Sequence, residues 1–574
     1  MGVSRVCGIC GGAATFYLPG ATEVADPGAM SPTCHVPGQH GDLYRCRECG
    51  TVQQPDLPKG LELTELYRAM HDVRYLDQEE GRRRTAGRLL DLIGEHVPPR
   101  AHGRRARFLD VGCGHGLLLD EASSRGYETI GLELSAGAAR HGRETLGLDV
   151  REQTVDQLAA EGCEPFDAIV LADVIEHLDD PNAILDELAA LLAPGGVLCV
   201  VTPDPASKTA RVARGRWWGF IPAHTYLLPR RTLRELLSAR GLVVSTDVPL
   251  VRDFTLRYWM AGFAERSGAI AAAVERASRS RRADAMVSLS LGDERVMLAH
   301  RVEVLRTERP LAKPRGGDQQ VLVVLPAYKA ARTIPQVADE LPADSADGVL
   351  LVDDCSPDET TEVALEHGFD VLRHPVNRGY GANQKSCYVQ AARDGYDAVV
   401  MVHADNQYDP GLVPQIVAPI LEGRADVVIG SRLLEDRAIQ GGMPRWKWVG
   451  NRFLTGLENA AFRRGYSEYH TGYRAFSVPF LRSISFLRNS DEFVFDQEIF
   501  AQAVARGARV EEVAIPTRYF LEASSVSFRD SVEYGLRTLY VLARFRLSEH
   551  GRPWAPLGAP AARLDADPEP ALDR

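Results

Sequence analysis

The chain has 574 residues, of which 45% are hydrophobic and 25% charged, and its formal net charge is -12. This length predicts about three or four folding units, and the composition is that of a globular protein. The acidic balance excludes a global basic field, so nucleic acid is not an expected partner. No apolar run reaches the roughly 18 to 20 residues that span a bilayer, and the start of the chain has no hydrophobic signal core, which predicts a cytoplasmic protein.

Residues 1–58 are predicted to form a small zinc-ribbon-like domain. They contain two Cys-x-x-Cys pairs, Cys7 with Cys10 and Cys46 with Cys49, each followed by glycine. Two such pairs supply the four thiolates that structural Zn²⁺ prefers, and the glycine permits the turn that directs backbone N–H groups at the sulfurs. Because four sulfurs leave no position for water, we expect this metal to stabilise the fold and not to catalyse.

Residues 59–250 begin with a helical arm and continue as alternating strand-like and helical runs. The strand-like runs FLDVG, TIGLE, FDAIVLAD and GGVLCVVTP predict a parallel α/β sheet. The first run ends in a glycine-rich turn, where the backbone can approach a ligand closely. Asp110 in this turn would repel the pyrophosphate of a dinucleotide, but it suits the cationic sulfonium of S-adenosylmethionine. Glu133, 23 residues later, is placed to accept both hydroxyls of a ribose.

Together with FDAIVLADVIEHLDDP and LLAPGGVLCVVTP, these runs make residues 105–247 resemble class I S-adenosylmethionine-dependent methyltransferases, which have a Rossmann-like fold. The cysteine pairs and the helical arm resemble zinc-bearing members that act on sugars in natural-product pathways. The resemblance implies a set of cofactor contacts: Asp110, Gly112 and Gly114 at the methionine end, Glu133 at the ribose and Asp156 at the adenine.

Two histidines are candidates for the base that removes a proton from the methyl acceptor. His177 follows the fourth strand-like run, and the alternative is that it only caps or packs its loop. His224 ends the aromatic stretch WWGFIPAH and is an equal candidate. The aromatic side chains of that stretch either stack on a sugar or pack in the core, and core packing is favoured.

Residues 251–317 are expected to connect two domains, because they contain the Arg-rich stretch ERASRSRRAD and end in LAKPRGGDQQ, where Pro and Gly break regular structure. A second alternating α/β series occupies residues 318–547. Its motifs VLVVLPAYKAARTI, LLVDDCSPDET, HPVNRGYGANQKSCY, VVMVHADNQYDP, VIGSRL, YHTGYRAFS and EFVFDQE resemble those of family 2 glycosyltransferases, specifically dolichyl-phosphate mannose synthase. The resemblance covers residues 320–547 and implies a GT-A fold, a nucleotide-sugar donor and inversion at the anomeric carbon.

Donor and metal ligands are expected at the ends of these strands, where open α/β sheets bind ligands. The expected donor-binding residues are Pro326, Tyr328, Asp353 and Asp354 at the base and ribose, and Arg432 at a phosphate. Asp405 and Gln407 offer hard oxygens to a divalent cation that neutralises the departing diphosphate. His403 replaces the first acid of the usual Asp-x-Asp pair, so Mn²⁺ is favoured over Mg²⁺.

Two acids, Glu468 and Asp496, are candidates for the base on the acceptor side. If the acceptor is already an anionic phosphate, either acid can instead orient the substrates. The resemblance implies a polyprenyl phosphate acceptor, with a small molecule or glycan as the alternative.

Residues 530–547 combine apolar positions with Arg537, Arg544 and Arg546 in a helix-compatible pattern, which predicts peripheral contact with an anionic membrane. The alternative is that this helix packs on the second sheet. Residues 548–574 are predicted to be a disordered tail. The chain is therefore interpreted as a bifunctional enzyme that transfers a methyl group and a sugar. The alternative is a single glycosyltransferase whose first half is a binding module.

Overall fold

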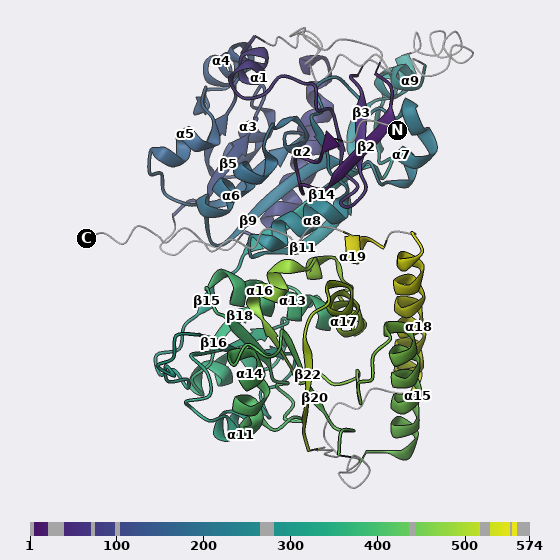
Figure 1. The fold of residues 1–574 in the computed structure, drawn as a ribbon. Helices are drawn as coiled ribbons and strands as arrows, with labels where there is room; N and C mark the ends of the chain where they lie inside the picture. The colour runs from purple at the N-terminus through teal and green to yellow at the C-terminus, as the bar shows by residue number, and fades with distance from the viewer. Residues whose placement is uncertain are drawn as a thin grey trace. The chain divides into compact units, whose positions relative to one another are not determined.

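The computed structural model describes residues 5–20, 40–69, 75–97, 104–264, 281–435, 443–516, 528–551 and 554–558. It divides the chain into two units, Met1–Arg301 and Val302–Arg574 (Figure 1). Each unit contains its own α/β sheet, which confirms the prediction of two separate α/β domains. Among the described residues, none of the helices combines the length and the hydropathy of a membrane span.

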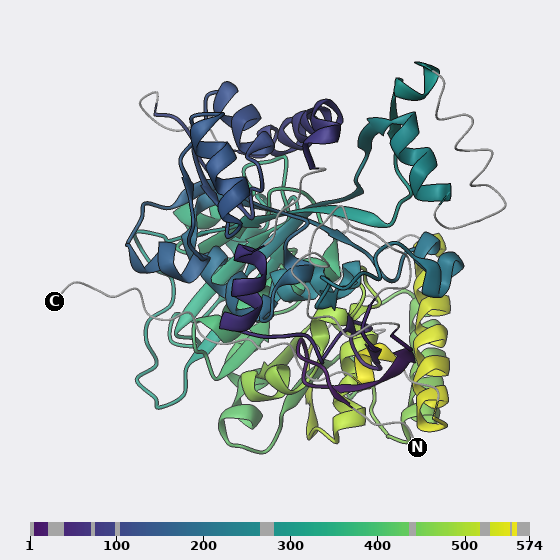
Figure 2. The ribbon, with the colours of Figure 1, turned by 90° about the horizontal axis from the view of Figure 1, so that it is seen from above.

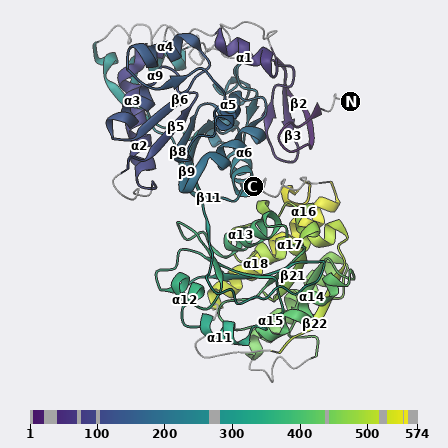
Figure 3. The same cartoon turned by 90° about the vertical axis from the view of Figure 1, so that its left-hand side faces the viewer.

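The main sheet of the first unit has seven strands in the order β11-β14-β9-β8-β5-β6-β7. Figure 3 shows β6, β5, β8 and β9 side by side in this order. The strands are β5 (Arg107–Val111), β6 (Glu128–Leu132), β7 (Val150–Arg151), β8 (Phe166–Ala172), β9 (Leu192–Pro203), β11 (Leu242–Pro249) and β14 (Glu294–Arg301). The accompanying helices include α2 (Glu79–Gly94), α3 (Leu117–Ser124), α4 (Ala136–Glu144), α5 (Val155–Ala160), α6 (Pro181–Leu191) and α8 (Arg230–Ala239). The five strands from β9 to β7 are parallel, as predicted.

The prediction of a connector over residues 251–317 is wrong. β14 lies inside the sheet and pairs antiparallel with both β9 and β11. Its central residues Val296–Ala299 are buried on both faces, because Met297 and Ala299 pack in one core cluster and Val296 and Leu298 pack in another. β12 (Arg252–Thr255) pairs with β13 (Met286–Leu289), so this stretch belongs to the first unit. Beyond Arg301, β15 (Val304–Leu305) joins the second sheet.

The cysteine pairs lie on a separate small sheet with the order β1-β2-β3-β4-β10. Its strands are β1 (Arg5–Val6), β2 (Ala13–Leu18), β3 (Leu43–Cys46), β4 (Val52–Gln53) and β10 (Tyr226–Leu227), and Figure 2 shows the dark purple ones from above. β10 comes from the methyltransferase-like part of the chain, so this sheet does not end at residue 58. The helical arm starts with α1 (Leu61–Arg68).

The second unit has an eight-stranded mixed sheet with the order β15-β18-β17-β16-β19-β21-β20-β22. Its further strands are β16 (Val321–Ala327), β17 (Gly348–Asp353), β18 (Asp370–Arg373), β19 (Ala398–Met401), β20 (Val427–Ser431), β21 (Arg474–Ser477) and β22 (Val510–Ala514). β21 runs antiparallel to both of its neighbours. The helices include α11 (Ile334–Glu340), α12 (Thr360–Glu366), α13 (Tyr380–Arg393), α14 (Val413–Leu421), α15 (Arg445–Phe462), α17 (Phe495–Arg506) and α18 (Phe528–Glu549).

Part of the predicted disordered tail is ordered. Trp554 is buried in the core beside α17 and α18, and it is followed by the short helix α19 (Ala555–Gly558). Gln502 Nε2 donates to the carbonyl oxygen of Pro556 at 2.8 Å, which ties this segment to α17. Residues 559–574 lie outside the described residues.

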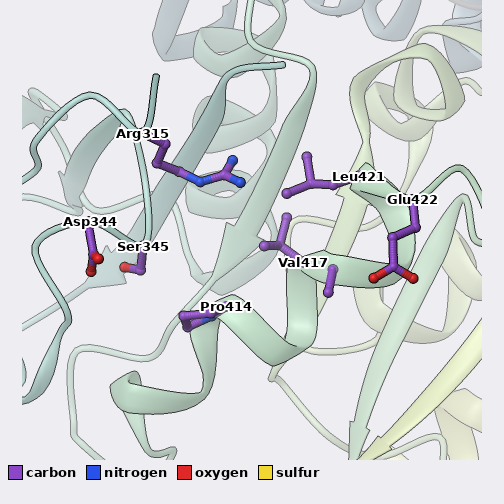
Figure 4. Close-up of a pocket in the computed structure, with 8 residues that line it drawn as sticks. Arg315, Asp344, Ser345, Pro414, Val417, Leu421 and Glu422 are labelled. Carbon is purple, nitrogen blue, oxygen red and sulfur yellow. The ribbon is translucent and has the colours of Figure 1, made fainter. Parts of the chain in front are cut away.

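A cavity of about 320 Å³ lies between the segment at Arg315 and helix α14 (Figure 4). Arg315, Ser345 and Leu421 line it, and each precedes the start of a strand, β16, β17 or β20. The cavity is therefore at the amino-terminal edge of the strands. Donor ligands are expected at the opposite, carboxyl-terminal edge.

Candidate active sites

The glycine-rich turn after β5 is held against the end of β6. The backbone nitrogen of Gly112 donates to the carbonyl oxygen of Leu132 at 2.8 Å. Gly112 has a φ of +70°, and a Cβ at this position would lie 2.6 Å from Val174, so only glycine fits. Gly114 N donates to Glu133 Oε2 at 2.8 Å. The turn and the predicted ribose ligand are thus fixed to one another.

Asp110 and Glu133 are two acids at this edge of the sheet, and Asp110 is buried. Burial, and then the charge of Glu133, raises the pKa of Asp110 to about 8. Burial also raises the pKa of Glu133, against the effect of the backbone N–H groups of Ser135 and Gly114. A buried acid beside a half-buried one favours a positively charged ligand.

Asp156, the predicted adenine ligand, is in the segment that follows β7. It lies exposed in the first turn of α5, and its charge acts on Glu187 of the neighbouring helix α6. Gln153, which follows β7 directly in the loop before α5, was missed in the sequence. Its Nε2 is buried without a hydrogen-bond partner among the described residues, so it is the better candidate for an adenine contact. Its position just after a strand was the available signal.

His177 and His224 are brought together, with ring centroids 4.8 Å apart. His177 Nδ1 lies 2.9 Å from the carbonyl oxygen of Ala223, and His224 Nδ1 lies 2.7 Å from that of Gly219. A carbonyl only accepts, so Nδ1 carries the hydrogen in both rings, and a neutral ring then keeps a lone pair on Nε2. Burial lowers the pKa of His177. A neutral histidine can accept a proton at its unprotonated ring nitrogen.

Two further groups belong to this histidine cluster. Three side chains, those of Glu176, His177 and His224, each place one possible metal-binding atom within 4.8 Å of the other two. Tyr67 from α1 places its hydroxyl 3.1 Å from His177 Nδ1. Tyr67 could not be identified from the sequence, because this contact joins residues more than a hundred positions apart.

The aromatic stretch before His224 is part of the core. Trp217 and Phe220 are only 2% and 3% exposed and pack with Leu43 and Val52 of the small sheet. The indole nitrogens of Trp217 and Trp218 both donate to Asp293, at 2.7 Å. The structure therefore agrees with the favoured prediction that the aromatic side chains of this stretch pack in the core.

The four cysteines of the small sheet converge. The Sγ atoms of Cys7, Cys10, Cys46 and Cys49 all lie within 4.8 Å of one another. Cys7 and Cys49 are 3.7 Å apart, and Cys10 and Cys46 are 3.5 Å apart. Tetrahedral zinc with bonds of about 2.3 Å requires sulfurs about 3.8 Å apart, so the residues fit this ion. The backbone nitrogen of Cys49 also points at Cys46 Sγ, as predicted for such a turn.

At the expected donor site, Tyr328 is 50% exposed and Pro326 is half-buried at the end of β16. Asp353 is fully buried and accepts from Ser356 N at 2.9 Å and Thr361 Oγ1 at 2.7 Å. The carboxylate of Asp354 likewise accepts hydrogen bonds from within the protein, and its donors are Arg378 N, Gly379 N and His374 Nδ1. Both acids thus support the loops after β17 and β18, and their lone pairs are less available to a nucleotide than the sequence suggested.

The metal-ligand candidates follow β19. Asp405 and Gln407 are both half-buried, and Asp405 Oδ1 accepts from Gln407 N at 3.1 Å. Asn406 between them has a φ of +57°, a conformation that asparagine tolerates. His403 packs against Gly472, where a Cβ would lie 2.2 Å from its Nε2. The glycine of the YHTGYR motif therefore makes room for the imidazole.

Arg432 and Glu468, predicted to serve different substrates, are bound to one another. Arg432 N and Nε donate to the Glu468 carboxylate at 2.8 and 3.0 Å, and Asn451 Nδ2 adds a bond at 2.8 Å. Burial tends to raise the pKa of Glu468, but these bonds hold it below its usual value. An ionised, fully bonded carboxylate is a poor base, so the structure does not favour Glu468 in that role.

Asp496 is linked instead to His403 through a tyrosine. Tyr380 donates to Asp496 Oδ2 at 3.2 Å, and its oxygen lies 3.2 Å from His403 Nε2. Because the phenol has one hydrogen, it accepts from His403, which leaves a lone pair on His403 Nδ1. Gln384 Nε2 donates to Asp496 Oδ1 at 3.1 Å. Tyr380 is a site residue that the sequence did not reveal.

Two family models match the chain. The methyltransferase domain model matches residues 79–246, and the glycosyl transferase family 2 model matches residues 322–484. The chain joins a methyltransferase domain to a family 2 glycosyltransferase domain. Each match lies within one of the two structural units. This confirms both of the domain types predicted from the motifs.

Individual relatives cover only parts of the chain. The ubiquinone biosynthesis O-methyltransferase of Xylella fastidiosa is 42% identical over 118 residues, which are 20% of this chain and 46% of that protein. That of Caulobacter sp. strain K31 is 39% identical over 114 residues, 19% of this chain and 45% of the relative. The chain thus spans about half the length of these O-methyltransferases.

Other similarities indicate no substrate. An uncharacterized protein of Methanocaldococcus jannaschii is 30% identical over 226 residues, 39% of this chain and 90% of that protein. The crystal structure of glucosyl-3-phosphoglycerate synthase from M. tuberculosis shares 20% sequence identity over 42% of this chain and 84% of that chain, with a TM-score of 0.32. This likeness is too weak to indicate an activity.

Proposed function

We propose that the first unit transfers a methyl group from S-adenosylmethionine to a hydroxyl or acidic carbon of a sugar or its aglycone. One observation carries this proposal. His177 and His224, each with a hydrogen on Nδ1, lie side by side on loops of the unit whose main sheet carries Asp110 and Glu133. When bound, the cofactor supplies the electrophilic methyl group. Asp110 then balances its positive charge, Glu133 holds the ribose, and one histidine Nε2 takes the acceptor proton.

We propose that the second unit transfers a sugar from a nucleotide sugar with inversion, with Mn²⁺ or Mg²⁺ bound by Asp405 and Gln407. The donor set fits such an ion, because both side chains offer hard oxygens and the nearby His403 keeps a lone pair on Nδ1. When bound, the ion neutralises charge on the departing diphosphate. Asp496 is the acid assigned to the acceptor, as base for a hydroxyl or as orienting group for a phosphate.

Donor binding gives the first experiment. Melting of the full chain is followed with GDP, UDP, dTDP and CDP sugars, each with and without Mn²⁺. A ligand of the native state raises the melting temperature with the logarithm of its concentration over Kd. One nucleotide class should stabilise the chain only when Mn²⁺ is present. If none does, the metal-dependent transferase proposal is wrong.

We propose that the glycosyl acceptor is presented at an anionic membrane surface, as a polyprenyl phosphate. The outer face of α18 carries exposed apolar side chains, with Leu536 and Tyr540 each 63% exposed. The neighbouring helix α15 adds Val449 at 59% and Phe453 at 63% exposure (Figure 1). The inner face of α18, including Leu542 and Phe545, packs in the core, and the outer face is the one that we assign to the membrane.

Charge supports the membrane in preference to a neutral partner. α15 carries Arg445, Lys447 and Arg452, and its one acid, Glu458, is buried. On α18, Arg537 and Arg546 form ion pairs with Glu533 and Glu549. Each basic residue near an anionic surface contributes about 1 kcal/mol, so the basic residues of α15 are expected to add to the attraction of the apolar face.

The alternative of a single active glycosyltransferase remains a distinct outcome. It predicts that S-adenosylmethionine binds without methyl transfer, or does not bind. Calorimetry with S-adenosylmethionine, followed by a methyl-transfer assay on the glycosylated product, separates the two cases. We favour two active enzymes, because the charged and basic groups of both sites are present together.

A further inference from the structure

The small cysteine-bearing sheet continues directly into the loop that carries His224. β4 pairs antiparallel with β10, with Gln53 opposite Tyr226 and Val52 opposite Leu227. Gln54, the next residue after β4, donates its backbone N–H to the carbonyl oxygen of Thr225 at 3.0 Å. The residue that follows His224 is therefore hydrogen-bonded to the cysteine-bearing segment.

The side chain of Gln54 holds the same loop more firmly. It is only 2% exposed, and its Nε2 donates to the carbonyl oxygens of Ile221 at 2.8 Å and His224 at 2.7 Å. Its Oε1 accepts from Gly41 N at 2.7 Å. An amide nitrogen has two hydrogens, so both are used. Gln54 fixes the two ends of the short segment from Ile221 to His224.

This segment also determines where the other histidine lies. Ala223 provides the carbonyl oxygen 2.9 Å from His177 Nδ1, and Thr225 Oγ1 donates to the carbonyl oxygen of His177 at 3.4 Å. A shift of the loop would therefore move His224 and release His177 from its carbonyl partner. The separation of the two rings depends on the bonds made by Gln54.

Both cysteine pairs contact elements around this loop. The carbonyl oxygen of Cys49 accepts from Thr232 Oγ1 of α8 at 2.6 Å. Ile9, between Cys7 and Cys10, accepts from Asn182 Nδ2 of α6 at 3.1 Å. Gly8 packs against Tyr226, where a Cβ would lie 2.1 Å from the hydroxyl oxygen. The metal-binding turns must be formed for these contacts to exist.

We infer that the cysteine-bearing segment forms part of the methyl-acceptor site and that Gln54 is a positioning residue for His177 and His224. This inference rests on the proposed methyl transfer. The cofactor turn is held by other bonds, from Gly112 N to Leu132 and from Gly114 N to Glu133. The segment is therefore expected to control the acceptor side of the reaction and not cofactor affinity.

The neighbouring glutamine provides a matched control. Gln53 is equally buried, at 3%, but its side chain bonds within the cysteine-bearing segment, to Val6 O at 2.9 Å and Gly8 N at 3.1 Å. Gln54→Met and Gln53→Met each remove the amide bonds and keep side-chain volume. The bonds that Gln54→Met removes reach the loop that carries His224, whereas the bonds that Gln53→Met removes do not.

The experiment uses the full chain with ¹³C-labelled histidine rings, and the signals are assigned from His177→Gln and His224→Gln. Gln54→Met should shift or broaden both ring signals, while the Kd for S-adenosylmethionine from calorimetry changes less than twofold. Gln53→Met should leave the ring signals in place. Gln54→Asn, which keeps the amide but shortens the side chain, gives a milder test if Gln54→Met does not fold.

Unchanged ring signals in folded Gln54→Met or Gln54→Asn would overturn the inference. So would equal shifts in the Gln53 and Gln54 variants, because general loosening of the segment would then explain both. If the ring signals move as expected but the unsubstituted chain methylates no acceptor, the positioning role stands and the proposed methyl transfer is wrong. The two failures are thus distinguished.

Discussion

Arg432 donates to the carboxylate of Glu468 from its backbone nitrogen and from its guanidinium group, at 2.8 and 3.0 Å. The Glu468 side chain is fully buried and that of Arg432 is 13% exposed, so the ion pair is screened little by water. A buried acid in such a pair supports the fold. Asp496, which accepts from Tyr380 and Gln384 and lies 3.7 Å from Arg474 Nη1, is the other candidate acid for the acceptor.

Glu468→Gln is expected to destabilise the second unit. Removing one charge of a buried ion pair costs about 3 to 5 kcal/mol, because the other charge stays buried. The folded-state pKa of Glu468 is depressed below 4.5, so its stabilisation is present above pH 4.5 and lost as the pH falls through the folded-state value. Urea unfolding at neutral and acidic pH measures both effects.

Glu511→Gln is the control, because it breaks the exposed pair with Arg424 and should destabilise the unit much less. Equal losses in the two variants would contradict the assignment of Glu468.

Asp496→Asn should reduce glycosyl transfer to a hydroxyl acceptor by about a hundredfold or more, which is the usual effect of losing a general base. Donor binding in the thermal-shift assay should be unchanged. Tyr380→Phe removes the hydroxyl that joins Asp496 to His403 and is expected to give a smaller loss in kcat. If Glu468→Gln retains its fold but loses more activity than Asp496→Asn, the two roles are reversed.

Asp405→Ala should abolish the Mn²⁺ dependence of donor binding, because Gln407 and His403 supply no negative charge to balance a divalent cation. Asp409→Ala is the matched control. Asp409 lies in the same loop, but its Oδ1 caps the following turn by accepting from Gly411 N at 2.9 Å. Mn²⁺-dependent stabilisation by a nucleotide sugar that survives in Asp405→Ala would exclude this metal site.

Binding of S-adenosylmethionine should release a proton at neutral pH. The pKa of Asp110 is about 8 in the ligand-free chain, so below pH 8 the acid mostly holds its proton. The cationic ligand favours the ionised form, and affinity should therefore rise with pH, by at most about tenfold per pH unit, and level off above pH 8. Calorimetry in buffers of different ionisation enthalpy measures the number of protons that are released on binding.

Asp110→Asn should bind more weakly and lose this pH dependence. Unchanged affinity in that variant would show that Asp110 does not face the cofactor.

Leu536→Glu and Phe453→Glu should each reduce co-sedimentation of the full chain with vesicles containing anionic lipid. Both side chains are 63% exposed, so the substitutions place a charge on the apolar face without disturbing the core. Val212→Glu in the first unit, where Val212 is 84% exposed, should have no effect. If the unsubstituted chain stays in the supernatant at low salt, the acceptor is not reached at a membrane.

The sequence alone determined the two domain types and most strand ends. Runs such as FLDVG and GVLLVDD are short, apolar and followed by turn residues, so their identity as buried strands is a local property. The paired cysteines were likewise readable, because the spacing within each pair is local. The connector prediction failed because β14 is a single strand whose partners, β9 and β11, lie far earlier in the chain.

Tertiary structure decided which candidates work together. The two alternative base candidates, His177 and His224, form one cluster. Glu468 and Arg432 were predicted to have separate roles, but they form an ion pair with each other. Tyr67, Gln54 and Tyr380 could not be found from the sequence, because each acts through a contact with a residue distant in the chain. Sequence motifs indicate which side chains can react. Whether such a side chain is charged, hydrogen-bonded or free depends on its partners, and only the folded chain brings those partners close to it.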